Sequence, residues 1–216
     1  MNHNELLLVY GTDYTSMTKE LLKAANLDQH IMEKYRNRQQ ESSVEKDFQQ
    51  EINPRKNLRI GIKPNLVAPV PAEDGGTTHP EVVEGVICYL KELGYENLIV
   101  MESSWVGDRT EDSFQVCGYY ELEEKYGIEL LDMKKARAVE LDCAGMKLTV
   151  CEPPLQVDFL INIPVLKGHC QTRITCALKN MKGLLPDSQK RAFHRMGLHE
   201  PIGHLSAGIH QDFILV

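Results

Sequence analysis

The chain has 216 residues, of which 42% are hydrophobic and 25% are charged, and its formal net charge is −7. This composition is typical of a soluble globular protein, and the acidic balance argues against general binding to nucleic acid or to anionic membranes. No stretch approaches the roughly 18 apolar residues of a membrane helix, and the start, MNHNELLLVYG, lacks the basic region of a signal peptide, so we expect a cytoplasmic protein.

The N-terminal part of the chain predicts a strand, a helix and then a polar stretch. The run from Glu5 to Tyr10, ELLLVY, predicts a buried strand that ends before Asp13, and the apolar spacing from Ser16 to Ala25 predicts a helix. Residues 29–56 are polar and predict a solvent-facing helix, or an insertion or linker.

A second strand and a helix follow. Leu58 to Lys63 predicts a strand that a proline ends. Thr78 with Glu81 three residues later predicts a capping box, with Pro80 in the first helical turn and Gly94 at the carboxyl end of the helix.

The remaining elements alternate in the same way. Strands are predicted at 97–101, 128–132, 157–163 and 213–216, and a hairpin is predicted at 138–151. Helices are predicted at 112–126, near 173–181 and after Asp187, and a loop is predicted at 197–208. The fold class is therefore α/β, an open, mostly parallel sheet with flanking helices and a small β-hairpin, in a single domain over residues 1–216. Because the final FILV shows no stop signal, we expect a sheet truncated at its C-terminus, in the N-terminal part of a longer domain.

The stretch from Ile161 to Pro186 turns from apolar to cationic. No carboxylate occurs between Asp158 and Asp187, and residues 163–216 hold seven Lys and Arg against three Asp and Glu. Five of the eight histidines also lie in this last quarter. A basic segment on an acidic body suits a small anionic ligand, although a solvated basic face explains the charge equally well.

Polar side chains follow the predicted strands at their carboxyl ends, where open α/β sheets bind ligands. Asp13, Lys63, Glu102 and Lys167 each follow or end a different predicted strand. We predict a joint site with the catalytic candidates Lys179, His169 and Glu102. The predicted substrate-binding residues are Lys63, Asn65, Ser103, Lys167, Asn180, Lys182 and His194.

Each candidate also has a structural interpretation. Any α/β protein places polar residues at this edge, Asn65 could form a turn, Glu102 could pair with a lysine, and cations such as Lys179 and Lys182 favour the last turn of a helix. Against this, several cations near one another lower a lysine pKa, and a neutral lysine can act as a base or nucleophile.

The cysteines predict neither a metal site nor disulfides. None of the six forms C-x-x-C, and several lie in apolar contexts, so we predict reduced core thiols and no bound metal; they are Cys88, Cys117, Cys143, Cys151, Cys170 and Cys176. His194 and His199 flank Gly197, but their spacing matches no known metal pair.

A set of motifs in this order resembles one family. They are YGTD, KPNLV, TTHPEVVEGVI, VMESS, FLINIPVLKGH, ALKNMKG and MGLH, and they resemble the bacterial and archaeal family called domain of unknown function 362. Members of that family often continue into a ferredoxin-like segment with [4Fe-4S] cysteine motifs, which this chain lacks. The family is distantly similar to the N-terminal part of nickel-pincer lactate racemase, which would make Lys179 the cofactor lysine and His169 and His194 the acid–base pair, although the surrounding residues depart from the racemase pattern.

Three functions are consistent with these residues. The first is an enzyme that binds a small anionic substrate or cofactor at the strand ends and performs acid–base chemistry. The second is a redox or electron-transfer module that docks a partner protein and whose iron–sulfur part is absent from this chain. The third is a non-catalytic fold whose Lys and His are structural. The sequence specifies neither the cofactor nor the reaction.

Overall fold

The computed structural model describes residues 6–41 and 53–216. Within them, five strands form one parallel sheet in the order β3-β2-β1-β6-β9. The strands are β1 (Ile60–Pro64), β2 (Leu98–Glu102), β3 (Glu129–Asp132), β6 (Phe159–Ile163) and β9 (Phe213–Ile214). The predicted α/β class with a parallel sheet is confirmed.

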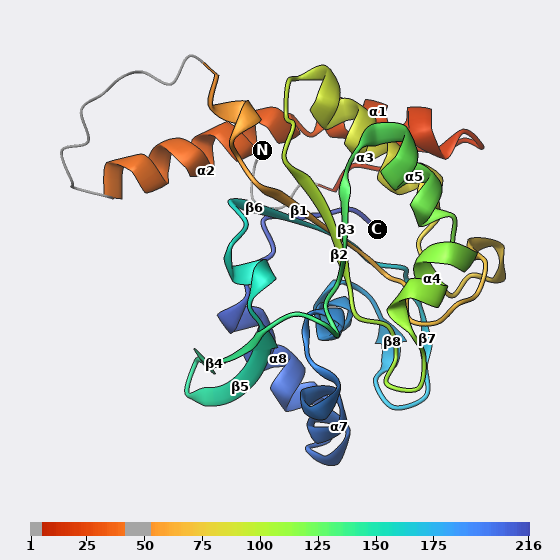
Figure 1. Cartoon of the computed structure of the whole chain (residues 1–216), viewed down its shortest axis with the longest axis vertical. Coiled ribbons are helices and arrows are strands. Elements are labelled where there is room, and N and C mark those ends of the chain that lie inside the picture. Colours follow the sequence, from red (N-terminus) through yellow and green to blue (C-terminus); the bar gives the residue numbers. More distant parts are fainter. Residues whose placement is uncertain (1–5, 42–52) are drawn as a thin grey trace.

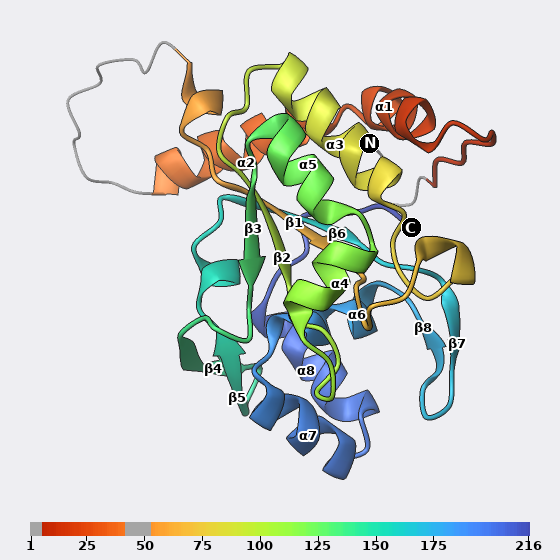
Figure 2. The same ribbon diagram turned by 45° about the vertical axis from the view of Figure 1, so that its right-hand side comes forward.

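Two antiparallel hairpins extend from this sheet. The predicted hairpin is formed by β4 (Ala138–Cys143) and β5 (Met146–Cys151), which pair along their whole length. The second hairpin, β7 (Lys167–His169) with β8 (Arg173–Thr175), follows directly after the inner strand β6. Figure 2 shows that it projects from the carboxyl end of the sheet.

Helices cover the sheet on both sides. They are α1 (Tyr14–Ala24), α2 (Leu27–Glu41), α3 (Pro80–Glu92), α4 (Thr110–Val116), α5 (Tyr119–Tyr126), α6 (Ala177–Asn180), α7 (Asp187–Arg195) and α8 (His199–Gly208). Short 3-10 turns lie at η1 (Pro54–Lys56), η2 (Ala72–Asp74), η3 (Pro153–Leu155) and η4 (Met181–Leu184). In Figure 1, α1, α3 and α5 lie on one side of the sheet, and α7, α8 and the β4–β5 hairpin lie on the other.

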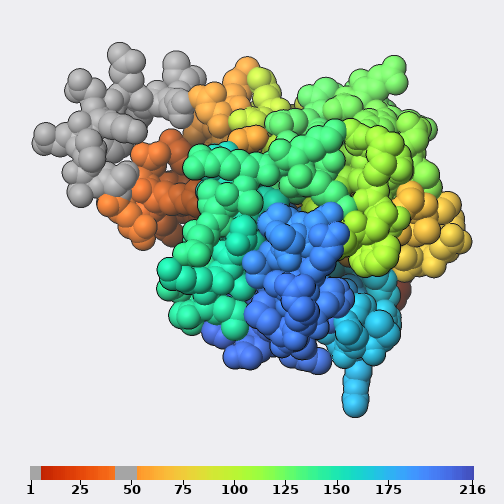
Figure 3. Space-filling view, turned by 60° about the horizontal axis from the view of Figure 1, so that its bottom comes forward, coloured from red at the N-terminus to blue at the C-terminus, as the bar shows by residue number. Residues whose placement is uncertain are grey.

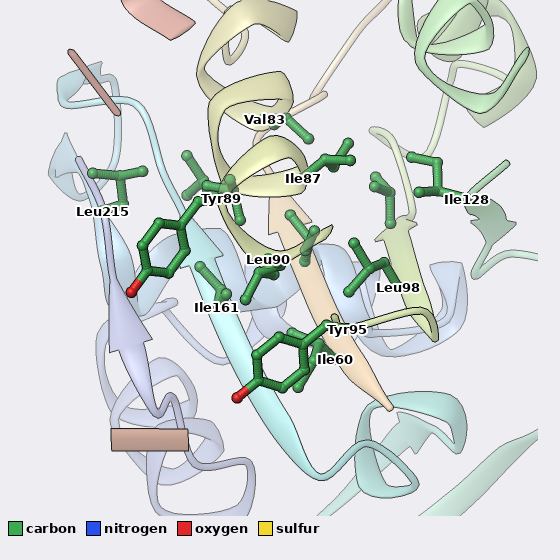
Figure 4. Close-up of a cluster of buried hydrophobic side chains, with 14 of the residues drawn as sticks. Ile60, Val83, Ile87, Tyr89, Leu90, Tyr95, Leu98, Ile128, Ile161 and Leu215 are labelled. Carbon is green, nitrogen blue, oxygen red and sulfur yellow. The ribbon is translucent and has the colours of Figure 1, made fainter. Parts of the chain in front are cut away.

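The pleat of the strands divides the core into two clusters. Ile60 and Ile62 of β1 face α3, where Figure 4 shows Val83, Ile87 and Leu90 packed over the strands. The intervening residues of β1 face the other way. Gly61 of this strand lies against Met101 and Leu160, which belong to the cluster under α8 and the β4–β5 hairpin. Both faces of the sheet are therefore buried, as expected for parallel strands.

The prediction of a first strand at residues 5–10 is wrong for residues 6–10, which are the part that the structure describes. Residues 6–10 form no strand, and Leu6, Leu8 and Tyr10 are largely exposed; Glu5 lies outside the described residues. The alternation of apolar residues is present, but a strand needs a neighbour for its backbone hydrogen bonds, and this segment pairs with none of the described strands. Asp13 instead caps α1 through Ser16.

The polar stretch 29–56 begins as a helix. Residues 29–41 belong to α2, which buries Leu27, Ile31 and Met32. Asn53 caps the turn η1, and the part between lies outside the described residues. Of the two predicted alternatives for this stretch, the solvent-facing helix therefore applies to residues 29–41.

The predicted capping box at Thr78 is wrong, although the helix that follows it is confirmed. The helix begins at Pro80, and its N-cap, His79, makes no side-chain hydrogen bond. Thr78 Oγ instead donates to the carbonyl of Ile163 and accepts from the amide of Asn65, each at 2.8 Å. The threonine side chain thus links β1 to β6 rather than capping the helix.

Three further element predictions differ from the structure. The helix predicted over 112–126 is broken at Gly118, whose φ of 74° interrupts it between α4 and α5. The helix predicted near 173–181 shortens to α6, because Arg173 has a φ of 62° and starts β8. The loop predicted over 197–208 is largely the helix α8, in which Gly208 allows close packing against Leu141. The helix predicted after Asp187 is present as α7, and the Asp187 side chain pairs with Lys134 and Lys190.

Candidate functional site

A cavity of about 370 Å³ lies at the carboxyl edge of the sheet. Its walls come from the segments after β1 and β2, the β7–β8 hairpin, and the region from α6 to α7. The lining residues are Asn65, Val67, Glu102, Ser103, Ser104, Trp105, Lys167, His169, Cys170, Gln171, Thr175, Lys179, Asn180, Lys182, Gly183, Lys190 and His194. In Figure 3 the atoms coloured for residues near 170 stand out from the body beside α7.

The structure brings the sequence-predicted site residues together. All of the predicted candidates line this cavity except Lys63, which lies directly beneath it with its side chain fully buried. Asp13 lies elsewhere, at the start of α1. Sequence reasoning missed Lys190, Thr175 and Trp105, because no spacing rule links them to the strand ends. Their position becomes evident only when α7 and the hairpin fold back over the sheet.

Lys63 and Glu102 form a buried ion pair at the floor of the cavity. Lys63 Nζ lies 2.8 Å from Glu102 Oε2 and also donates to the carbonyl of Pro64. The carboxylate accepts two backbone N–H groups as well, from Leu66 at 2.7 Å and from Ser103 at 2.7 Å. Burial lowers the pKa of Lys63, and Glu102 opposes that shift. These contacts favour a structural role for Glu102 over the proton-transfer role predicted from the sequence.

A network of amide side chains joins the strand ends to α6. Asn180 Nδ2 lies 2.7 Å from Asn162 Oδ1 and 3.2 Å from the carbonyls of Lys63 and Pro64. Asn180 Oδ1 accepts from Asn65 Nδ2 at 2.7 Å. Because these buried amides satisfy one another, they fix the start of η4 against β1 and β6.

Lys167 is anchored at the edge of this network. Its ammonium donates to Asn65 Oδ1 at 2.7 Å and to the carbonyl of Gly76. An ammonium carries three N–H donors, so one remains for a ligand. Burial, and then the positive charge of Lys179, lowers the pKa of Lys167 to about 8.

Lys190 differs, because its donors are already used. It is 5% exposed and donates to the carbonyls of Ser103 and Ser104, at 2.7 and 2.6 Å, and to Ser103 Oγ. Burial lowers its pKa to about 8, and the nearby carboxylates of Glu102 and Asp187 oppose the shift. Lys190 therefore holds the segment after β2 in place rather than presenting a free charge.

Lys179 and Lys182 present the least satisfied ammonium groups. Lys179 makes no hydrogen bond or ion pair with any described residue, and burial lowers its pKa. Lys182 Nζ donates to His194 Nε2 at 3.2 Å and lies 6.0 Å from the centre of the Phe193 ring. Burial, and then the charge of Lys179, lowers the pKa of Lys182 to about 8. Among the described residues that line the cavity, Glu102 is the one carboxylate, and its charge is already paired with Lys63. It therefore does not balance the charges of Lys179 and Lys182.

The two imidazoles are held in defined tautomers. His169 Nδ1 accepts the backbone N–H groups of Gln171 and Thr172, at 3.2 and 3.1 Å, so a neutral ring carries its proton on Nε2. His194 Nδ1 donates to Gln171 Oε1 at 2.8 Å, which leaves its Nε2 to accept from Lys182. Burial, and then nearby lysines, lowers the pKa of both rings below its usual range, which favours their neutral forms.

Thr175 contributes an unsatisfied donor. Its side chain is 1% exposed, and its buried hydroxyl has no hydrogen-bond partner among the described residues. Leaving such a group unpaired costs about 1–3 kcal/mol. Thr175 lines the cavity, so a ligand bound there could satisfy its hydroxyl.

The cysteines remain free thiols within the structure. Cys117, Cys143 and Cys151 are buried, whereas Cys170 is exposed at the hairpin and lines the cavity. Burial raises the pKa of Cys151 to about 12. Among residues 6–41 and 53–216, no group of three or more His, Cys, Asp and Glu side chains is arranged to hold a metal ion.

The fold and this cavity define an α/β protein that presents a lysine-rich pocket at the carboxyl edge of a parallel sheet. Residues 60–216 match the family described as Domain of unknown function (DUF362), and the chain belongs to this family. The resemblance predicted from the motifs is thereby confirmed.

A curated relative extends this comparison. A protein of Synechocystis sp. named as thylakoid-associated is 26% identical to the chain over 136 residues. The match covers 63% of this chain and 42% of the relative, so it spans less than half of the relative's length. Within residues 6–41 and 53–216, none of the helices has the length and hydrophobicity of a membrane-spanning segment. The cytoplasmic location stays a prediction.

Proposed function

We propose that the pocket binds a small anionic substrate or cofactor and performs acid–base chemistry on it. The observation that supports this most is the ammonium of Lys179, which is partly buried and has no partner among the described residues. Lys167 and Lys182 line the same cavity, and each retains at least one free N–H. Burying like charges together without a counter-charge is costly, and a bound anion would remove that cost.

The same lysines supply a base. A lysine can accept a proton only when it is neutral. Burial lowers the pKa of Lys179, and burial, followed by the charge of Lys179, lowers the pKa of Lys182 to about 8. A catalytic base works best when its pKa lies near the working pH. In this proposal Lys167 and Lys182 hold the anion, and the neutral form of Lys179 takes the proton and then pairs with the anion as an ammonium.

His169 would act as a hydrogen-bond donor rather than as a base. Its Nδ1 lone pair is occupied by two backbone N–H groups, so the ring offers Nε2–H to the cavity side. A neutral imidazole that donates in this way polarises a carbonyl or stabilises a developing oxyanion. Glu102 and Lys63 support the floor of the pocket from below.

The redox alternative rests on the family resemblance, and no contact in the described residues favours it. It stays a prediction, as do the iron–sulfur cofactor and the redox partner protein. The structural alternative explains Lys63, Lys190 and Asn180, whose donors are satisfied within the fold. It does not explain the unpaired Lys179 and Thr175.

A thermal-shift screen tests the proposal. The purified chain is heated with acetate, malonate, sulfate and inorganic phosphate at constant ionic strength. A ligand that binds only the folded state raises the Tm, and at one hundred times its Kd it adds about 2.7 kcal/mol of stability. We expect at least one anion to raise the Tm by several degrees, and Lys179→Met with Lys182→Met to abolish that rise.

The control is Lys147→Met, which removes one lysine charge from an exposed position on the β4–β5 hairpin. It should keep the full rise in Tm. If none of the four anions stabilises the native chain, or if the double variant responds as strongly as Lys147→Met, the pocket is not an anion site.

A further inference from the structure

We propose that the anion is a phosphoryl group, held by Lys179, Lys182 and the hydroxyl of Thr175, on a small organic molecule that contacts Trp105. This inference rests on the proposed function and names the class of ligand. Three independent features of the pocket support it: an orphaned hydroxyl, an excess of charge without arginine, and an apolar wall.

The hydroxyl of Thr175 is the first feature. Its neighbour in β8, Ile174, is 56% exposed, whereas Thr175 turns inward and lines the cavity. A buried hydroxyl without a partner is unusual in a folded protein, and each such group calls for an explanation. An oxyanion that accepts from Thr175 Oγ would satisfy it.

The charge of the pocket is the second feature. Glu102 is neutralised by Lys63, so Lys167, Lys179 and Lys182 are not balanced by any carboxylate that lines the described part of the cavity. This excess suits a dianion better than a monoanion. No arginine lines the described part of the cavity, so the planar bidentate pairing that a guanidinium makes with a carboxylate or a phosphate is absent there. Lysines that act as point charges from several directions suit the tetrahedral oxygens of a phosphoryl group.

The apolar wall is the third feature. Val67 and Trp105 line the cavity from the segments after β1 and β2, and the Trp105 amide donates to the Val67 carbonyl at 2.7 Å. Trp105 is 57% exposed. The cavity of about 370 Å³ is of the size that accommodates a small molecule rather than a single ion. We therefore place the organic part of the ligand against Trp105.

Trp105 also provides the experiment, because it is the one tryptophan in the sequence. Its fluorescence is titrated at pH 7 with phenyl phosphate and with benzoate, at equal ionic strength. We expect phenyl phosphate to bind at least about tenfold more tightly than benzoate, since it carries the extra charge and oxygen atoms. A hydrogen bond to a charged group is worth about 1.5–3 kcal/mol, so Thr175→Val should weaken phenyl phosphate about tenfold or more.

Two variants control for folding and position. Thr175→Ser keeps a hydroxyl and should retain most of the affinity. Thr149→Val makes the same substitution in β5, away from the cavity, and should change nothing. If Thr175→Val does not fold, Thr175→Cys compared with Thr175→Ser gives the same test, since a thiol is a weak donor.

The outcomes separate this inference from the proposed function. If benzoate binds as tightly as phenyl phosphate and Lys179→Met weakens both, the anion site stands and the phosphoryl assignment is wrong. The assignment is also wrong if removal of the Thr175 hydroxyl leaves phenyl phosphate binding unchanged. If neither probe binds the native chain, the anion site and the phosphoryl assignment both fail.

Discussion

At the scale of single residues, two kinds of lysine surround the pocket. Lys63 and Lys190 are buried and donate to groups within the protein, so they hold the strand ends in place. Lys179 and Lys182 keep free N–H groups that face the cavity. The first kind should affect stability when it is changed, and the second kind should affect ligand binding.

Lys63→Met tests the first kind. The substitution leaves the carboxylate of Glu102 buried and without its ionic partner. Removing one partner of a buried pair costs about 3–5 kcal/mol. We expect the free energy of unfolding, measured by urea denaturation, to fall by about that amount. The exposed Lys147→Met should change it by less than about 0.5 kcal/mol. A small effect at Lys63 would show that the pair contributes little to the fold.

Gly183 offers a second residue-scale test. A Cβ at this position would lie 2.6 Å from Lys63 Cε and 2.7 Å from Lys63 Nζ and would also contact Glu102 Oε1. Overpacking a buried site costs about 1–3 kcal/mol, so we expect Gly183→Ala to destabilise the chain by that much in the same urea assay. Gly168→Ala is the matched control, because nothing lies near its Cβ position. Equal stability of the two variants would contradict the close approach of η4 to the ion pair.

At the scale of elements, Gln171 connects the β7–β8 hairpin to α7. Its Oε1 accepts from His194 Nδ1, and His194 in turn accepts from Lys182. A hydrogen bond contributes about 0.5–1.5 kcal/mol, so its loss should increase local opening several-fold. We expect Gln171→Ala to speed amide hydrogen exchange over residues 167–175 about fivefold.

The control for this prediction is Gln156→Ala, at an exposed position after η3. It should leave hairpin exchange unchanged. If exchange over residues 167–175 is the same in both variants, the link between Gln171 and His194 does not restrain the hairpin in solution.

Most strands of the sheet could be predicted from the sequence, but the long-range hydrogen bonds at the strand ends could not. Strands β1, β2 and β6 appear as apolar runs followed by polar residues, and this pattern is local. Thr78 also fits a local pattern, the capping box, yet its hydroxyl bonds to Ile163, 85 residues away. Local patterns cannot show such a competing partner. The strand prediction for residues 6–10 was wrong for a related reason. A strand needs a neighbouring strand, and the residues of the segment itself do not specify one.

At the scale of the whole molecule, the sequence predicted which residues meet at the candidate site, but it did not predict the role of each residue. Parallel strands bring their carboxyl ends to one edge, so Asn65, Glu102 and Lys167 were expected to meet. Whether a lysine is free depends on acceptors that are distant in sequence, as Lys190 shows with Ser103, 87 residues before it. The orphaned hydroxyl of Thr175 carries no sequence signal, because it depends on the packing of the hairpin.

The lysine-rich pocket should also make stability depend on pH. Burial lowers the pKa of Lys167, Lys182 and Lys190 to about 8 in the folded chain, below the value of about 10.4 of an unfolded lysine. Between these values the unfolded chain binds more protons than the folded one, so stability rises with pH. We expect the unfolding free energy of the native chain to increase between pH 7.5 and pH 10 relative to that of Lys182→Met.

The measurement for this prediction is urea denaturation of both proteins across that range. The comparison with the variant cancels the titration of the other lysines. A difference that stays constant from pH 7.5 to pH 10 would mean that Lys182 titrates with its ordinary pKa, and therefore that it is neither buried in the pocket nor held beside Lys179.

The central claim is that Lys179 and Lys182 exist to receive an anion. A crystal structure of the chain with phenyl phosphate bound tests it most directly. We expect phosphoryl oxygens within hydrogen-bond distance of Lys179 Nζ, Lys182 Nζ and Thr175 Oγ, with the phenyl ring against Trp105. A ligand bound elsewhere, or Lys179 still without a partner in a pocket that holds the ligand, would contradict the claim.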